Sequence, residues 1–521
     1  MKNILQKYHS NKFSIIIAVI LLALFFAFSF YGYLRVGLEY DEILTANAAL
    51  GCPHPDIFLS YAVHIGNRCI PIMLSPYIGA PMAFIPRVIF TFLMPSVQAI
   101  RMANILFVGT SLCILAISIW KIFGKKIALY TLFFLVFDAQ FLLTQRLDRT
   151  SVFPFFLKAI FLLFLFHVLY TKRKIGKIIF FLLGFFAGLN IYTKLDAVFW
   201  IGSIALALFI QHIYLHHFSK LIHGINLRNT ISVLAGMFVA VSPLLYYVRS
   251  AWINVFATAQ KLQGFTLAAY IEKLHGFFFQ LQIPETFSYV FEIVPTFPKM
   301  ISVLAVFCIL LWFLSAYKTI KQSKHVWIGI SFFIFFIVYM SYKGLIFSYH
   351  RLLIYPIPQL ALALFCSHLK RRSILYGIFA MYLIIFLSTY ISFDSLGKTT
   401  CGRGSFTCAI YPLYERVRHE NVPIVVGDWG IATQLLFLSN GKLDIHEVAF
   451  VTNQQNDPLI EQILSPLTKV CAPIILRPTS LAKFSLADSN LRKILSNVPQ
   501  YTQTDITDLF GNTQFEVFSC R

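Results

Sequence analysis

The stretch "FSIIIAVILLALFFAFSFYGYLRVGLEYDEIL", residues 13–44, joins a long apolar run directly to a group of acids. Residues 13–33 are long and apolar enough to cross a bilayer as one helix. Glu39, Asp41 and Glu42 follow at once. Ionised groups beside hydrocarbon are costly unless they have a partner or a task. The stretch therefore predicts a membrane helix with a functional site at its end.

The first apolar run could be mistaken for a signal peptide, because it follows Lys2, Lys7 and Lys12. It is longer than the apolar region of a typical signal peptide, and no small-x-small cleavage site closes it. We therefore expect an uncleaved span with a cytoplasmic N-terminus.

The composition is that of a polytopic membrane protein. The 521 residues are 58% hydrophobic and 12% charged, with a mean hydropathy of +0.73. We expect about eleven spans, at residues 13–33, 102–120, 127–144, 152–170, 178–193, 197–215, 230–248, 299–317, 326–342, 352–369 and 374–391.

The net charge of +21 lies entirely in the membrane part. Residues 1–397 carry 32 Lys and Arg against 11 Asp and Glu, whereas residues 398–521 carry 11 of each kind. Much of the excess sits in short loops, as the positive-inside rule requires, so nucleic acid is not implied as a partner. Reading these loops as cytoplasmic puts the N-terminus inside and the C-terminus outside.

Residues 70–95 are apolar but hold four prolines before Pro95, and Arg87 interrupts them. Proline removes a backbone donor and kinks a helix, so we expect amphipathic helices on the outer surface instead of another span. If the segment did span the membrane, every later loop would change sides.

Residues 396–521 read as a small external α/β domain, following a membrane domain at residues 1–395. Short β-like runs, "VPIVVGD", "APIILRP" and "FEVFSC", alternate there with helical stretches such as "GIATQLLFLS". Two external loops are expected within the membrane domain, at residues 34–101 and, rich in aromatics, at residues 249–298.

The positions of the cysteines agree with this membrane topology. Six fall in predicted external segments, where disulfides persist: Cys52, Cys69, Cys401, Cys408, Cys471 and Cys520. Pairing neighbours in that order is reasonable, but the sequence does not fix the connectivity.

The sequence contains no GxxxxGK[ST] phosphate loop, no GxGxxG after a strand, no HExxH and no Cys-x-x-Cys knuckle. Instead, ionisable residues gather in the predicted external loops, in "LEYDEIL", "QRLDRTS", "YTKLD" and "SYHRLLIYP". Carboxylates beside cations at a membrane boundary suit a substrate with an anionic head group and a lipid tail. Two structural roles are the alternatives to substrate binding. Arg and Lys side chains at span ends can extend to lipid head groups, and Asp148 can form a local ion pair with its neighbouring arginines.

At these residues the sequence resembles GT-C fold glycosyltransferases, including protein O-mannosyltransferases (glycosyltransferase family 39) and lipid A aminoarabinose transferases. Asp41-Glu42 after the first span is similar to the family's first motif, and "QRLDRTSVFPFFLK" to its second acidic motif, although "RTS" replaces the usual Trp-Gly-Pro. "GFFAGLNIYTKLDAVFW" and "YHRLLIYPIPQLAL" are similar to later segments, so the likeness covers roughly residues 13–395.

The resemblance implies an inverting transferase of the inner membrane that takes a sugar from a polyprenyl phosphate on the extracytoplasmic face. It implies Asp41 as general base, Glu42 as a residue that orients the acceptor or shapes the site, and Asp148 as a second acidic contact. Candidates for the donor phosphate are Arg101, Lys194, His350 and Arg351. Some members of the family use a divalent metal, but no closed ligand set is evident here. The acceptor could be protein, glycan or lipid.

Two other functions remain open from the sequence. A flippase or transporter of lipid-linked sugars would hold ionisable residues at mid-membrane in broken helices. A catalytically inactive relative that serves as a binding subunit would tolerate the altered "LDRTS" motif, although the intact Asp41-Glu42 argues against it.

Overall fold

The computed structural model describes most of the chain. The described residues are 2–51, 61–66, 68–147, 149–171, 175–216, 227–259, 267, 270–271, 274, 287, 290–293, 299–321, 325–341, 352–453, 464–498 and 500–520. Four residues singled out from the sequence, Cys52, Asp148, His350 and Arg351, lie outside them, as does most of the predicted loop at residues 249–298.

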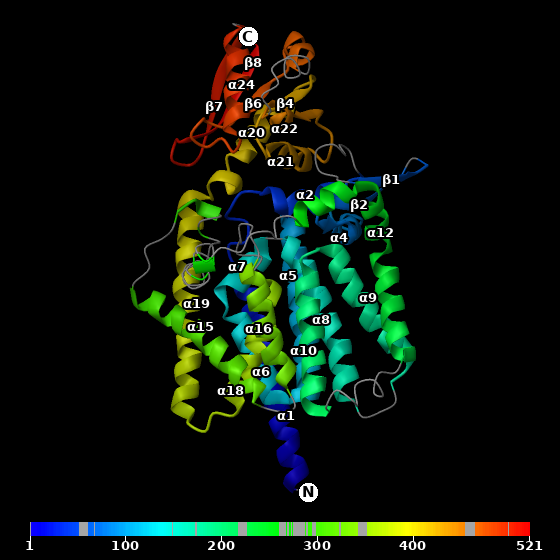
Figure 1. Ribbon diagram of the computed structural model, residues 1–521. Coiled ribbons are helices and arrows are strands. Elements are labelled where there is room, and N and C mark those ends of the chain that lie inside the picture. Colours follow the sequence, from blue (N-terminus) through cyan, green and yellow to red (C-terminus); the bar gives the residue numbers. More distant parts are fainter. Residues whose placement is uncertain are drawn as a thin grey trace.

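A bundle of apolar helices makes up the larger part of the molecule (Figure 1). Among the described residues, seven helices can each cross a membrane by length and composition. They are α1 (Lys2–Phe30), α5 (Val97–Phe123), α8 (Arg149–Tyr170), α10 (Ala197–His216), α12 (Leu227–Ala259), α15 (Lys299–Ile320) and α19 (Arg372–Thr400). The prediction of a polytopic helical membrane protein is confirmed.

The remaining expected spans correspond to shorter or broken helices. α6 (Lys125–Val136) and α7 (Ala139–Leu147) occupy one expected span and meet at a bend of 64°. Three others hold α9 (Lys177–Thr193), α16 (Val326–Ser341) and the 3-10 turn η2 (Leu352–Ile354) followed by α18 (Ile357–Ser367). α12 runs to Ala259, past the start of the predicted loop at residue 249.

The segment at residues 70–95 does not form a full-length span, but it is not purely helical either. β1 (Tyr61–Ile65), β2 (Arg68–Ser75) and β3 (Ile78–Gly79) form an antiparallel sheet, followed by the short helix α4 (Pro81–Phe90). The expectation of helices throughout was wrong for residues 70–79, where β2 pairs with β1 and with β3. Pro71 lies opposite Ala62 beside a register shift in the β1–β2 pairing, a position where proline is tolerated in a sheet. These elements lie at the same end of the bundle as the C-terminal domain (Figure 1).

The C-terminal domain is an α/β unit at one end of the bundle (Figure 1). Its five-stranded sheet has the order β5-β4-β6-β8-β7, formed by β4 (Ile424–Val426), β5 (Ile445–Glu447), β6 (Ile474–Leu476), β7 (Tyr501–Thr507) and β8 (Thr513–Cys520). β4, β5 and β6 run parallel, and β8 is antiparallel to its neighbours. Helices α20 (Ile410–Val417), α21 (Ile431–Leu438), α22 (Ala449–Thr452) and α24 (Ser485–Ser496) connect and cover the strands.

The C-terminal domain shares an apolar core with the loop that follows α1. This loop contains helix α2 (Tyr40–Ala49), whose Ile43 and Leu44 are buried together with Ile431 and Leu435 of α21. Asn47 Nδ2 also donates to the Thr433 carbonyl oxygen at 2.9 Å. Burial of apolar surface therefore holds the domain against the end of the bundle where the acids lie.

Disulfides join Cys401 to Cys408 and Cys471 to Cys520, with Cα–Cα distances of 5.7 Å in both. These are two of the three pairings considered from the sequence. Cys69 is also disulfide-bonded, and Cys52 lies outside the described residues.

Candidate active site

Helix α2 presents the acids, and Glu39 fixes how it begins. Glu39 is buried and adopts an extended backbone conformation at the N-cap, where its Oε2 accepts from the Asp41 amide at 2.7 Å and the Glu42 amide at 3.3 Å. A side-chain acceptor at this position satisfies amides that have no partner within the helix. The sequence alone gave Glu39 no role, and its role is to cap this helix.

Glu42 forms a buried ion pair with Arg101 of α5. Arg101 Nε donates to Glu42 Oε1 at 2.5 Å and Nη2 donates to Oε2 at 2.8 Å. The other guanidinium donors reach the carbonyl oxygens of Tyr33, Val36 and Gly37 at 2.8–3.0 Å. The pair is 0% and 1% exposed, so Arg101 locks the chain between α1 and α2 in place.

This geometry corrects the phosphate-binding role expected of Arg101. Arg101 has no donor left for a substrate phosphate, since all its N–H groups are directed to Glu42 and to backbone carbonyls. Glu42 is equally occupied and is enclosed, so of its two expected roles the geometry favours shaping the site. The two residues position the site by holding α2 against α5.

Asp41 is the acid of this group that stays half-buried, between the capping Glu39 and the paired Glu42. It lies in the first turn of α2, where the helix dipole favours a negative charge. Its neighbour Tyr40 packs on Trp429 of the C-terminal domain, with ring centroids 4.5 Å apart. Asp41 therefore sits at the junction of the bundle and the C-terminal domain.

Gly37 connects the acid-bearing helix to the disulfide loop at residues 401–408. Its amide donates to the Phe406 carbonyl at 2.8 Å and to the Cys401 carbonyl at 3.2 Å, and its own carbonyl accepts from Arg101. A methyl group at this position would collide with the carbonyl oxygens of Phe406 and Thr407. Only glycine allows the two backbones to approach this closely.

Gly37→Ala is expected to destabilise the protein by about 1–3 kcal/mol, the usual cost of overpacking a tight site. The measurement is the melting temperature of the purified protein in detergent. Gly377→Ala is the matched control, because a Cβ added at Gly377 meets open space. Equal melting temperatures for the two variants would show that the Gly37 contact is not tight.

Arg146 on α7 belongs to "QRLDRTS", one of the external segments rich in ionisable residues. From the sequence, Arg146 had no individual role beyond a local ion pair with Asp148. It is 4% exposed; its Nη1 donates to the Tyr31 carbonyl at 3.0 Å, and its guanidinium lies over the Phe393 ring. Among the described residues no carboxylate lies within ion-pair distance of it, and its Nε has no hydrogen-bond partner. An uncompensated buried guanidinium is costly, so this arrangement suits an anion supplied from outside the chain.

Further cations lie around Arg146. Arg35 and Lys398 both pair with Asp394, and Arg35 and Arg101 lie within electrostatic range of Arg146. Among the described residues, Asp394 thus pairs with two cations, while Arg146 has no carboxylate within ion-pair distance. The signal for Arg146 in the sequence was its place two residues before Asp148.

Lys194 is buried at the end of α9, where its Nζ lies 3.6 Å from Asp196 Oδ2. Its backbone bridges to Ile78 of β3, so it joins the bundle to the sheet at residues 61–79. Lys158 of α8, which sequence reasoning missed, is also buried and donates to the Leu353 carbonyl at 2.6 Å. Lys158 therefore anchors the turn that directly follows Arg351 in the chain.

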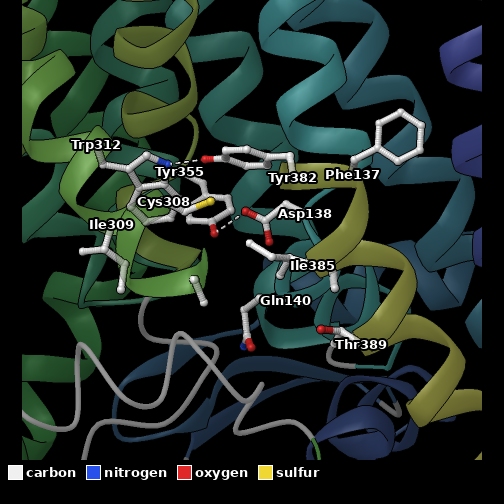
Figure 2. A pocket seen from close by; sticks show the side chains of 12 residues that line it. Phe137, Asp138, Gln140, Cys308, Ile309, Trp312, Tyr355, Tyr382, Ile385 and Thr389 are labelled. Atoms are coloured by element: carbon white, nitrogen blue, oxygen red, sulfur yellow. Dashed lines mark hydrogen bonds between the residues drawn. The ribbon is translucent and has the colours of Figure 1, made fainter. Parts of the chain in front are cut away.

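A cavity of about 60 Å³ lies within the bundle, at the bend between α6 and α7 (Figure 2). Asp138 lies in this bend and accepts from the Phe141 amide at 3.0 Å, Tyr355 Oη at 2.7 Å and Gln359 Nε2 at 3.3 Å. Trp312 Nε1 donates to Tyr382 Oη at 2.6 Å on the same wall. The cavity has room for water, but Asp41 is not among the residues that line it.

The described residues contain no group of three His, Cys, Asp or Glu side chains that could hold a metal ion.

The arrangement of helices and C-terminal domain matches known structures over nearly the whole chain. ArnT from Cupriavidus metallidurans in the apo state superposes with a TM-score of 0.65 at 12% identity, covering 98% of both chains. ArnT bound to undecaprenyl phosphate gives 0.62, also at 12% identity, covering 96% of this chain and 97% of that one. The chain has the GT-C fold.

An archaeal GT-C structure agrees. The Archaeoglobus fulgidus oligosaccharyltransferase, in a complex with zinc and sulfate, gives a TM-score of 0.51 at 12% identity, covering 96% of this chain and 72% of that one. No family model matches the sequence, and no curated protein sequence matches it. The GT-C assignment thus depends on the three-dimensional arrangement.

Proposed function

We propose that this GT-C protein is a glycosyltransferase that moves a sugar from a polyprenyl phosphate to an acceptor hydroxyl or amine, with inversion. The observation that carries the proposal is the separation of roles among the three acids. Glu39 caps α2 and Glu42 is locked to Arg101, so Asp41 is held in a fixed place at the domain junction. A general base needs this kind of fixed, accessible position.

In this mechanism Asp41 takes the proton of the acceptor as its oxygen or nitrogen attacks the anomeric carbon of the donor. The bond between that carbon and the phosphate oxygen breaks, and negative charge grows on the lipid phosphate. Arg146, with no carboxylate partner among the described residues, supplies the compensating positive charge. Asp148, His350 and Arg351 keep their sequence-based roles as proposals.

The fold comparison supports a lipid-phosphate donor, because one of the similar structures is an ArnT bound to undecaprenyl phosphate. The acceptor class stays open among protein, glycan and lipid. The transporter alternative gains a broken helix at Asp138, the feature expected of it. Asp138, however, accepts from Phe141 of α7, from Tyr355 just after η2 and from Gln359 of α18, so it stabilises the bend structurally.

The test of this function is donor consumption by the purified protein. Wild type in detergent or liposomes is incubated with radiolabelled undecaprenyl-phosphate hexoses and pentoses, together with envelope extracts as a source of acceptor. Release of undecaprenyl phosphate is expected with at least one donor. If every donor stays intact, the glycosyltransferase proposal fails.

The proposed orientation places Asp41 and the C-terminal domain outside the cytoplasmic membrane. Disulfides at Cys401–Cys408 and Cys471–Cys520 support this side, because they persist in oxidising compartments. A cysteine introduced by Leu34→Cys, at an exposed position next to the acids, is expected to react with a membrane-impermeant maleimide in intact cells. The control Lys121→Cys, near the opposite end of α5, is expected to react only after permeabilisation; the reverse pattern would invert the topology.

A further inference from the structure

The carboxyl edge of the parallel strands in the C-terminal domain faces helix α2. Asp428 and Trp429 follow β4 after Gly427, Glu447 ends β5, and Arg477 directly follows β6. In open α/β sheets, ligands bind at the carboxyl ends of parallel strands. In this protein helix α2 covers part of that edge. Tyr40, the residue before Asp41, packs there against Trp429.

Tyr40 and Trp429 form an aromatic pair at this edge. Their rings are tilted by 42° with centroids 4.5 Å apart, and Tyr40 also lies against Gly430, which has a positive φ of 86°. Both aromatic side chains are half-buried. The pair is therefore partly exposed, and it lies next to Asp41, which is itself half-buried and follows Tyr40 in the chain.

Glu447 supplies a carboxyl group beside the aromatic pair. It is half-buried, and its hydrogen bond is a long one from the Gly430 amide, at 3.4 Å. Among the described residues no cation pairs with Glu447, whereas the neighbouring Asp428 is paired with Arg477 at 3.2 Å. Burial, followed by the negative charge of Asp428, raises the pKa of Glu447 to about 7.

We propose that Tyr40, Trp429 and Glu447 form a sugar-ring subsite of the proposed glycosyltransferase, built by the carboxyl edge of the C-terminal sheet over Asp41. Aromatic faces pack on the C–H face of a sugar ring, and a carboxylate accepts charge-assisted hydrogen bonds from ring hydroxyls. This inference depends on the proposed function for the reaction, but the ring could belong to the donor or to the acceptor. Its chemistry is the same in either case.

A purely structural role accounts less well for these residues. An interdomain contact is already made by the apolar core of α2 and α21 and by the Asn47–Thr433 hydrogen bond. A carboxyl group with no cationic partner adds a desolvation cost to such a contact. Hydroxyl groups of a bound sugar would repay this cost by donating to Glu447.

The experiment is saturation-transfer NMR on the full-length protein in detergent, with methyl glycosides of several hexoses and pentoses as probes. At least one glycoside is expected to receive saturation from wild type, and Trp429→Ala and Glu447→Gln are each expected to weaken its binding about tenfold. Matched controls are Phe510→Ala and Glu415→Gln, two exposed positions elsewhere in the C-terminal domain. Their binding is expected to equal that of wild type.

The pH dependence separates direct contact from a structural effect. Glu447 faces Asp428, two residues after β4, and Tyr40 on α2, while His446 on its own strand pairs with Asp444, just before the strand, at 3.4 Å. Because the ionised carboxylate is the better acceptor, binding should strengthen as pH rises through about 7. Glu447→Gln should remove this dependence, whereas a misfolded edge would weaken binding at every pH.

The same assay identifies the source of the ring. A short prenyl-phosphate-linked hexose displaces the methyl glycoside if the subsite holds the donor sugar and leaves it bound if the subsite holds the acceptor. The proposal is overturned if no glycoside binds to wild type, or if Trp429→Ala and Glu447→Gln bind like the controls. Asp41→Asn should keep glycoside binding, so failure of the transferase function alone would leave this binding intact.

Discussion

Asp41→Asn is expected to slow sugar transfer by a factor of about 10²–10⁴, the range associated with loss of a general base. The amide keeps the shape of the side chain but cannot take the acceptor's proton. Glu39 and Glu42 keep α2 in place in the variant, since neither of their interactions involves the Asp41 carboxylate. The measurement is single-turnover release of undecaprenyl phosphate from a donor that wild type consumes.

Two comparisons make this result specific. Glu415→Gln removes an exposed carboxylate that pairs with Arg418, so its rate should equal that of wild type. The melting temperature of Asp41→Asn should also stay close to that of wild type. Turnover by Asp41→Asn at the wild-type rate would remove Asp41 from the role of base, whatever the protein transfers.

Arg101→Met is expected to destabilise the protein by about 3–5 kcal/mol, because it leaves Glu42 as a buried charge without a partner. Three backbone carbonyls, of Tyr33, Val36 and Gly37, lose their donor as well. The measurement is the melting temperature in detergent and the fraction of protein that remains monodisperse after extraction.

The double variant Arg101→Met with Glu42→Leu is the matched control. Replacing both partners removes the stranded charge, so the double variant should be more stable than Arg101→Met alone. A different outcome would restore the role suggested by the sequence. If Arg101→Met kept the wild-type melting temperature but lost binding of undecaprenyl phosphate, Arg101 would be a phosphate ligand after all.

Hydropathy predicted the bundle well because a bilayer imposes length on its helices. Each expected span contains a helix, and the alternating "VPIVVGD", "APIILRP" and "FEVFSC" runs became β4, β6 and β8. The hairpin at residues 61–75 was missed. Its mixture of apolar residues and prolines was interpreted as a short amphipathic helix interrupted by proline. The bend at Asp138 was missed because one apolar run gives no sign of where its helix will break.

The sequence by itself determined that three acids lie at the end of the first span. Its resemblance to GT-C glycosyltransferases then indicated Asp41 as the general base. It could not separate the roles of Glu39, Glu42 and Asp41, because all three are carboxylates within four positions of one another. Tertiary structure decided this by placing Arg101, 59 residues further along the chain, against Glu42. The same is true of Trp429 and Glu447, which lie beside Tyr40 of α2 because the C-terminal domain buries its apolar surface on that helix.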